Sequence, residues 1–191
     1  MDVIQIINLM IFHLLILCGG DKGGTGKTVT AKVFSEYFLT HYPEILALVE
    51  CDRSNPDVGR VFKDKVLNFI LAFFSDDPAQ LTKADALFYA AVNNLITVCN
   101  LPAQVNQTIK TWLIEDNLYE LAEELKVKIT YLFVSDGGYD SIKLFLQTIE
   151  EFGPYMQIVF VRNWGLCDNW THVDADQDVQ AAITTHNVPI I

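Results

Sequence analysis

Short runs of apolar residues alternate along the chain with longer stretches in which apolar residues recur every three or four positions. Such continuous runs are typical of strands that are buried on both faces of a sheet. They lie at 11–17, 45–49, 95–99, 129–135 and 156–161. Because helix-like stretches separate the runs, the pattern predicts an α/β fold with a mostly parallel sheet and helices on both faces, in three α/β/α layers.

The helix-like stretches follow the spacing of one buried face. Asn55-Pro56 is a typical helix start, and the apolar positions after it predict a helix that continues to Phe73. Asn117 is expected to divide a long helical region into two helices. The tail Asn187–Ile191 resembles the beginning of another strand, so a chain truncated at its C-terminus is one expectation. The other predicted helices lie at 29–40, 78–91, 103–125 and 142–152, and Met1–Met10 receives no assignment.

The stretch between the first run and the first helix carries the chemistry. Residues 20–28 read Gly-Asp-Lys-Gly-Gly-Thr-Gly-Lys-Thr. Glycines at 23, 24 and 26 allow the backbone to bend so that its N–H groups, including that of Thr25, face phosphate oxygens. Lys27 would supply a cation for the β- and γ-phosphates, and the Thr28 hydroxyl is placed to ligate Mg²⁺. The combination favours a nucleotide site over a glycine-rich turn that binds nothing.

The stretch Lys22–Thr28 resembles the deviant Walker A motif, K-G-G-x-G-K-[ST], of the MinD/ParA family of P-loop ATPases. Asp21 stands where the standard phosphate-loop pattern has its first glycine, and Lys22 is the extra lysine that marks the family. The resemblance implies ATP and Mg²⁺ as cofactors. It also implies a nucleotide-dependent homodimer in which Lys22 reaches across to the phosphates of the partner.

Two later strand ends carry carboxylates. Asp52 matches the second aspartate of the family's Asp-x-Asp pair, which helps to position the attacking water and the Mg²⁺ shell, and Glu50 stands in the first place. A turn residue is the alternative for Asp52. Asp136 ends the run 129–135 as a Walker B aspartate does, so that its carboxylate would reach Mg²⁺. Gly137-Gly138 follows, where the family commonly has Thr-Pro-Pro, and would allow a close backbone approach to the γ-phosphate.

Asn163 follows the run 156–161, at the place where the family has an asparagine that recognises the adenine base. A simple turn asparagine is an equal alternative. The expected site is therefore catalytic at Lys22, Lys27 and Asp52. The metal would be held at Thr28, Asp52 and Asp136.

Composition sets limits on the partners. A chain of 191 residues is expected to form a single domain over 1–191, and a net charge of −11 argues against direct binding to DNA or to an anionic membrane. The apolar N-terminal stretch 3–17 is short and contains polar residues, which argues against a membrane span. The four cysteines are widely spaced and predict reduced thiols in a cytoplasmic protein.

The segments 19–28, 52–57 and 162–165 resemble the StbB-like branch of the family, which acts in plasmid stabilisation and conjugal transfer. The resemblance implies an ATPase that works as a dimerisation switch and recruits a protein partner of a DNA partition or transfer complex. Two alternatives remain open. One is an ATP-dependent kinase or synthase for a small molecule on the same scaffold, and the other is a module that binds nucleotide without hydrolysis.

Overall fold

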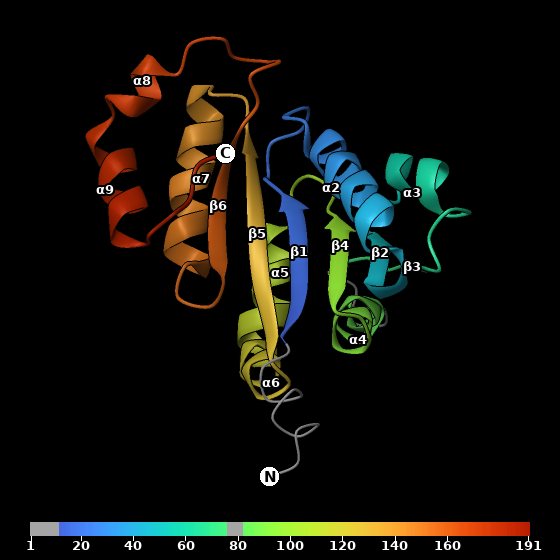
Figure 1. Cartoon of the computed structure of the whole chain (residues 1–191). Helices are drawn as coiled ribbons and strands as arrows, with labels where there is room; N and C mark the ends of the chain where they lie inside the picture. The colour runs from blue at the N-terminus through green and yellow to red at the C-terminus, as the bar shows by residue number, and fades with distance from the viewer. Residues whose placement is uncertain (1–11, 76–81) are drawn as a thin grey trace.

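The computed structural model describes residues 12–75 and 82–191, and within them the chain forms one six-stranded sheet. The strands lie in the order β3-β2-β4-β1-β5-β6, and every neighbouring pair is parallel. All carboxyl ends therefore meet at one edge, at the top of Figure 1. The strands are β1 His13–Gly19, β2 Leu46–Glu50, β3 Asn68–Leu71, β4 Ile96–Asn100, β5 Val127–Ser135 and β6 Gln157–Arg162.

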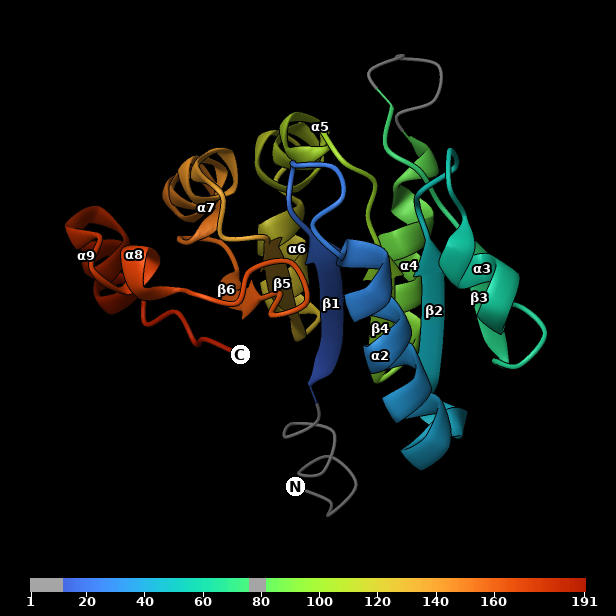
Figure 2. The ribbon, with the colours of Figure 1, turned by 90° about the horizontal axis from the view of Figure 1, so that it is seen from above.

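Helices cover both faces of this sheet, as Figure 2 shows from above. One face carries α2 (Lys27–His41) and α3 (Asp57–Phe62), and the edge at β6 is flanked by α8 (Thr171–Asp174) and α9 (Gln177–Thr185). The opposite face carries α4 Asp85–Asn93, α5 Asn106–Lys110, a π-helical turn Thr111–Glu115, α6 Leu118–Glu124 and α7 Tyr139–Phe152. A 3₁₀ turn, Pro43–Ile45, precedes β2. The predicted three-layer α/β/α fold is confirmed.

Alternating residues of β1 pack into the two layers, as the two-residue period of a strand requires. Leu15 and Leu17 are buried in the core beneath α4 to α7. Ile16 and Cys18 are buried in the second core, which Ala31 of α2 completes. A central strand buried on both faces gives the phosphate loop at its carboxyl end a fixed base.

The helix expected from Pro56 to Phe73 is wrong in its second half. The helix α3 ends at Phe62, and Asn68–Leu71 forms the edge strand β3, which pairs with Ala47–Glu50 of β2. The apolar spacing fits a helix, but the open edge of β2 offers backbone hydrogen bonds that a helix at this place would leave unmade. Tertiary pairing therefore overrides the local pattern.

The expected division at Asn117 is confirmed, and the tail pairs with β6 through a single bridge, whereas the truncation stays a prediction. Asn117 adopts φ 57° immediately before α6, so it divides the helical region. In the tail, Ile190 forms a parallel bridge with Phe160, and the Phe160 N–H donates to the Pro189 carbonyl at 2.8 Å. The segment Met1–Met10 and the start of the helix expected at Pro78 lie outside the described residues. Within 12–75 and 82–191, the helices are all too short or too polar to cross a membrane.

Candidate nucleotide site

The loop between β1 and α2 has the backbone shape that its glycines allow. Gly24 and Gly26 adopt φ of +77° and +104°, and Gly26 immediately precedes the first turn of α2. A Cβ at Gly26 would lie 2.4 Å from Nδ2 of Asn163, so a larger residue would have to displace Asn163 and adopt a strained φ. Gly23 and Gly24, in contrast, face open space within 4 Å. The loop is therefore packed against the protein at Gly26 and open to its surroundings at Gly23 and Gly24.

The same loop has features that suit a bound phosphate. The Thr25 side chain is buried, and its hydroxyl oxygen has no hydrogen-bond partner among the described residues. The loop also leads into the N-terminus of a 15-residue helix, whose dipole favours an anion at this end. An orphaned hydroxyl, an open glycine turn and a helix N-terminus together fit a bound phosphate group.

Lys27 lies in the first turn of α2 and is only 7% exposed. Its Nζ donates a 2.6 Å hydrogen bond to the backbone carbonyl of Lys22. Burial lowers the pKa of Lys27, while the negative charges of Asp21 and Asp52 act in the opposite direction. The ammonium therefore sits in a site of reduced dielectric, where its attraction to a phosphate is stronger than in water.

Lys22 is paired with Asp136, the carboxylate that follows β5. Their charged atoms, Nζ and Oδ2, lie 2.7 Å apart, and the Gly138 N–H donates to the other carboxylate oxygen at 3.0 Å. Partial burial acts to raise the pKa of Asp136, but the Lys22 ammonium and the Gly138 N–H outweigh it and hold the pKa below its ordinary value. The side chains are 32% and 20% exposed, so both partners remain within reach of solvent.

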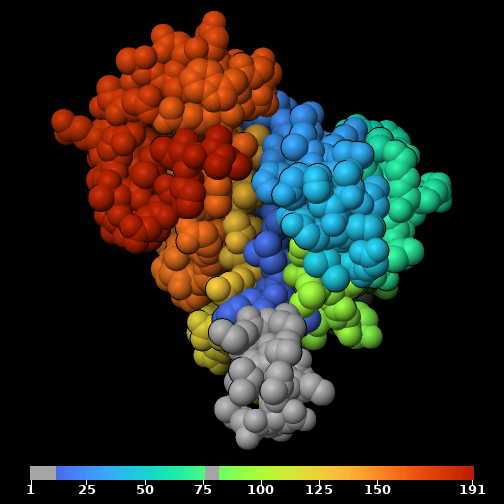
Figure 3. Space-filling model, in the orientation of Figure 1, coloured from blue at the N-terminus to red at the C-terminus, as the bar shows by residue number. Residues whose placement is uncertain are grey.

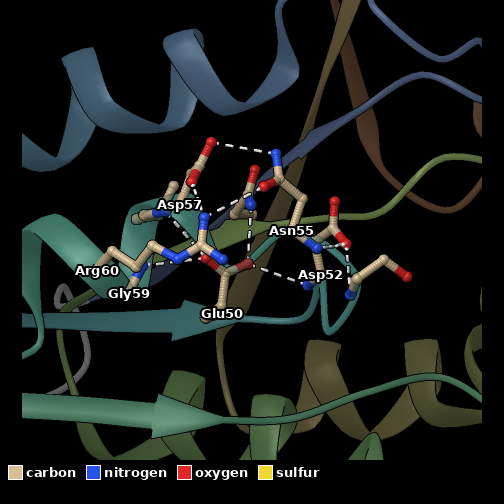
Figure 4. A network of polar contacts seen from close by, with 9 residues as sticks. Glu50, Asp52, Asn55, Asp57, Gly59 and Arg60 are labelled. Atoms are coloured by element: carbon tan, nitrogen blue, oxygen red, sulfur yellow. Dashed lines mark hydrogen bonds and ion pairs between the residues drawn. The ribbon is translucent and has the colours of Figure 1, made fainter.

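Glu50, at the end of β2, is held differently (Figure 4). It is 2% exposed, and one oxygen accepts from the N–H groups of Val58 and Gly59, each at 3.1 Å. The other oxygen accepts from the Asp52 N–H at 3.0 Å and from Asn100 Nδ2 at 2.7 Å. Burial raises the pKa of Glu50, and the four donors oppose that rise. This carboxylate fastens the loop after β2 to β4 and α3.

Asp52 stands in the loop that Glu50 fastens, half-buried. Its Oδ1 accepts from the N–H groups of Ser54 and Asn55, at 3.0 and 2.9 Å. This is the turn geometry that the sequence left open as an alternative. Its negative charge nevertheless acts on Lys27, so Asp52 lies within electrostatic reach of the phosphate loop.

Asn163 bridges the loop after β6 to the phosphate loop. Its Nδ2 donates to the Thr25 carbonyl at 2.8 Å, and its Oδ1 accepts from the Gly165 N–H. Figure 3 shows the segment after β6 (orange) beside the phosphate loop and α2 (blue) at the same end of the molecule. The neighbouring Trp164 is 59% exposed, whereas Trp170 is 2% exposed and belongs to the core.

The structure thus brings Lys22, Lys27 and Asp136 into one chain of contacts and attaches Asn163 to the same loop. Thr28 lies half-buried in the first turn of α2, and its hydroxyl makes no hydrogen bond with Asp52 or Asp136. A hydroxyl and a carboxylate are ligands of the kind that Mg²⁺ prefers, although the described residues contain no cluster of three or more acidic, His or Cys side chains that could hold a metal ion by themselves.

Sequence reasoning missed the anchors beneath the loop. Asp21 Oδ1 accepts from the N–H groups of Val105 and Asn106, at 3.0 and 3.1 Å. The Tyr131 hydroxyl accepts from the Gly20 N–H at 2.9 Å and donates to Asn106 Oδ1 at 2.8 Å. The φ of Asp21 is not positive, so this position needs no glycine. The departure of Asp21 from the standard motif was the available signal.

No family model matches the chain. Protein MobD of Acidithiobacillus ferrooxidans is 28% identical over 155 residues, which cover 78% of this chain and 63% of MobD. The chain therefore spans less than two thirds of the length of that curated relative.

Two solved structures have a similar arrangement. The MinD cell division protein of Aquifex aeolicus is 14% identical, with a TM-score of 0.46, and the match covers 93% of this chain and 80% of MinD. FlhF, solved in complex with GTP and Mg²⁺, is 13% identical, with a TM-score of 0.42, over 97% of this chain and 70% of FlhF.

Proposed function

We propose that this chain is a Mg²⁺-dependent P-loop ATPase that acts as an ATP-dependent dimerisation switch. The observation that carries the proposal is the double role of Lys22. Its backbone carbonyl accepts from Lys27 Nζ, and its side chain pairs with Asp136. One residue therefore connects the phosphate-binding lysine to the carboxylate expected at the metal, at the carboxyl ends of β1 and β5, where open α/β sheets bind their ligands.

The roles follow from the positions. The loop amides and the buried Lys27 would hold the phosphates, and Asn163 would lie at the base. Thr28 and Asp136 would hold Mg²⁺, which when bound neutralises charge on the phosphate oxygens. Asp52 would orient the attacking water, the role that the resemblance to the MinD/ParA family implies for this aspartate.

Lys22 would act across the dimer. To reach the phosphates of a partner, its side chain must leave Asp136, and a partly exposed ion pair gives up little free energy on separation. The phosphates of the second subunit would then replace the carboxylate as its counter-charge. The dimer would form only when both subunits hold ATP, and hydrolysis would release it.

The output we propose is recruitment of a protein partner of a DNA partition or transfer complex in the cytoplasm. Its support is the sequence resemblance to the StbB-like branch. The formal net charge of −11 disfavours a direct grip on DNA or on an anionic membrane.

Sedimentation velocity tests the switch. We expect a dimer with Mg²⁺·ATP and a monomer with Mg²⁺·ADP. Lys22→Ala should bind ATP, because Lys27 and the loop amides remain, but should stay monomeric. Lys143→Ala, which removes an exposed lysine of α7, is the matched control and should still dimerise.

Each other result points elsewhere. Nucleotide binding with no dimer in any condition would exclude the dimerisation switch. Binding and dimerisation without release of phosphate would identify a non-hydrolysing module. Failure of the wild-type chain to bind nucleotide would remove the proposal altogether.

One observation favours a second candidate, a kinase or synthase acting on a small molecule. A hollow of about 440 Å³ lies beside Asp52, and its lining includes the cations Arg53 and Lys83. The Arg53 guanidinium lies 4.3 Å from the ring centre of Phe73, which fixes one cation at the wall. Turnover by a monomer that requires an added small anion would support this candidate over the switch.

A further inference from the structure

The peptide unit between Gly137 and Gly138 is hydrogen-bonded on both sides. Its N–H, on Gly138, donates to Asp136 Oδ1 at 3.0 Å. Its carbonyl, on Gly137, lies 2.8 Å from Nε2 of His172. A trans peptide is planar, and its N–H and C=O groups point in opposite directions. His172 and Asp136 therefore bind opposite sides of one rigid peptide plane, which is called the plate below.

Glycine stands on both sides of this peptide unit, so rotation of the peptide plane is the motion to consider. The Gly137 N–H is already bound to Ser135 Oγ at 3.1 Å. Gly137 has φ +73°, and a Cβ there would lie 2.8 Å from the Cys167 Sγ, so the position requires glycine. With glycine on both sides, rotation of the plate about its long axis meets little steric resistance. The hydrogen bond from His172 opposes that rotation.

A carbonyl oxygen can only accept, so Nε2 of His172 must carry the proton in this contact. The histidine comes from α8, which the rest of the chain holds in place. Trp170 is buried just before it, Arg162 pairs with Asp174 of the same helix, and the Arg162 guanidinium lies 5.3 Å from the ring centre of Trp170. His172 therefore lies on a segment that side-chain contacts hold in place.

We propose that His172 is a positioning residue for Asp136. By fixing the Gly137 carbonyl, it aims the Gly138 N–H at the carboxylate that we assign to Mg²⁺ and to Lys22. The segment 163–172 would therefore act on the site at both ends, through Asn163 at the phosphate loop and through His172 at the carboxylate. The catalytic part of this inference rests on the proposed ATPase function, whereas the contact itself does not.

The test uses the full chain with His172→Leu, which removes the donor, and His172→Gln, which keeps an N–H donor near the same place. His41→Leu is the matched control, because His41 is an exposed histidine whose ring contacts the Tyr37 carbonyl at 2.8 Å, at the far end of α2. For His172→Leu we expect kcat for ATP hydrolysis to fall about fivefold, the scale of one lost hydrogen bond. The KM for ATP should stay within about twofold because the phosphate loop is untouched, and His172→Gln should restore most of kcat.

A second readout needs no turnover. In the protein without nucleotide, exchange of the Gly138 amide hydrogen, followed by NMR, should be about fivefold faster in His172→Leu and near wild type in His172→Gln. Unchanged Gly138 exchange in His172→Leu would overturn the inference. So would equal losses in both variants accompanied by a lower unfolding temperature, since that result indicates a purely structural histidine. If the wild type fails to hydrolyse ATP, the proposed function fails, and the exchange measurement still decides the role of His172.

Discussion

Two acidic residues, Glu50 and Asp136, mark the ends of two strands beside the phosphate loop, and they are held in opposite ways. Glu50 is 2% exposed and accepts four hydrogen bonds, three of them from backbone N–H groups. Asp136 is partly exposed and is bound by one backbone donor and one partly exposed lysine. The first carboxylate has its partners built into the fold, whereas the second can exchange its charged partner.

This difference separates a structural acid from a chemical one. A buried carboxylate whose lone pairs are all used cannot take up a metal without breaking the loop that it holds. A carboxylate paired with a partly exposed lysine can release that lysine to a phosphate and bind a metal cation in its place. The comparison therefore supports the proposal that Glu50 holds the β2–α3 loop in place and that Asp136 is the carboxylate that would take the metal.

The largest expected effect is on turnover. Asp136→Asn should lower kcat for ATP hydrolysis on the order of 100-fold, because the amide loses the charge that would face Mg²⁺. The unfolding temperature should change little, since the side chain is partly exposed. Coupled phosphate-release assays and thermal unfolding measure the two quantities. Asp140→Asn, at an exposed position in the first turn of α7, serves as the control. A large drop in unfolding temperature would make Asp136 a structural acid like Glu50.

The next effect is on stability. Glu50→Gln places an NH₂ group where two N–H donors point, so we expect a loss of about 2 kcal/mol in the free energy of unfolding. For a chain of this length that corresponds to a fall of roughly 5 °C in Tm. Urea and thermal unfolding measure it, with the exposed Glu44→Gln as the comparison. An unchanged midpoint together with lost turnover would instead give Glu50 a chemical role.

The smallest effect is a change in titration. Lys22→Met removes the ammonium that helps to hold the pKa of Asp136 below its ordinary value of 3.8, so that pKa should rise. A depressed carboxyl pKa stabilises the fold at neutral pH, and this contribution is lost as the pH falls through the folded-state pKa. In the variant, the free energy of unfolding should therefore differ less between neutral and acid pH than it does in the wild type. Carbon-detected NMR titration of the Asp136 carboxyl measures the change, and a pKa that matches the Lys143→Met control would contradict the pairing.

The sequence predicted the parts of the site that lie within one short stretch. Positive φ at Gly24 and Gly26 follows from a glycine-rich turn that enters a helix. The burial of Lys27 was not predicted. The strand ends that carry Glu50 and Asp136 were also predicted. It could not predict which of the two acids is saturated, because the donors to Glu50 come from three different segments that only the fold brings together.

The contacts of Lys22 and His172 could not be predicted from the sequence for a related reason. A lysine side chain has many rotamers, and its choice of Asp136 depends on strand order, which the apolar pattern leaves open. His172 lies in a four-residue helix with no motif of its own. The edge strand β3 was missed because its apolar spacing also fits a helix, and only the open edge of β2 decides between the two.

The residue just before the phosphate loop places a constraint on how this protein can change over evolutionary time. A Cβ at Gly19 would lie 2.3 Å from the Tyr131 hydroxyl oxygen, which itself accepts from the Gly20 N–H. A side chain at position 19 is therefore compatible only with a smaller residue at 131, and that change would strip Gly20 of its acceptor. Neither substitution is an acceptable first step alone, so a lineage of this fold would carry the two positions as a linked pair or leave both unchanged.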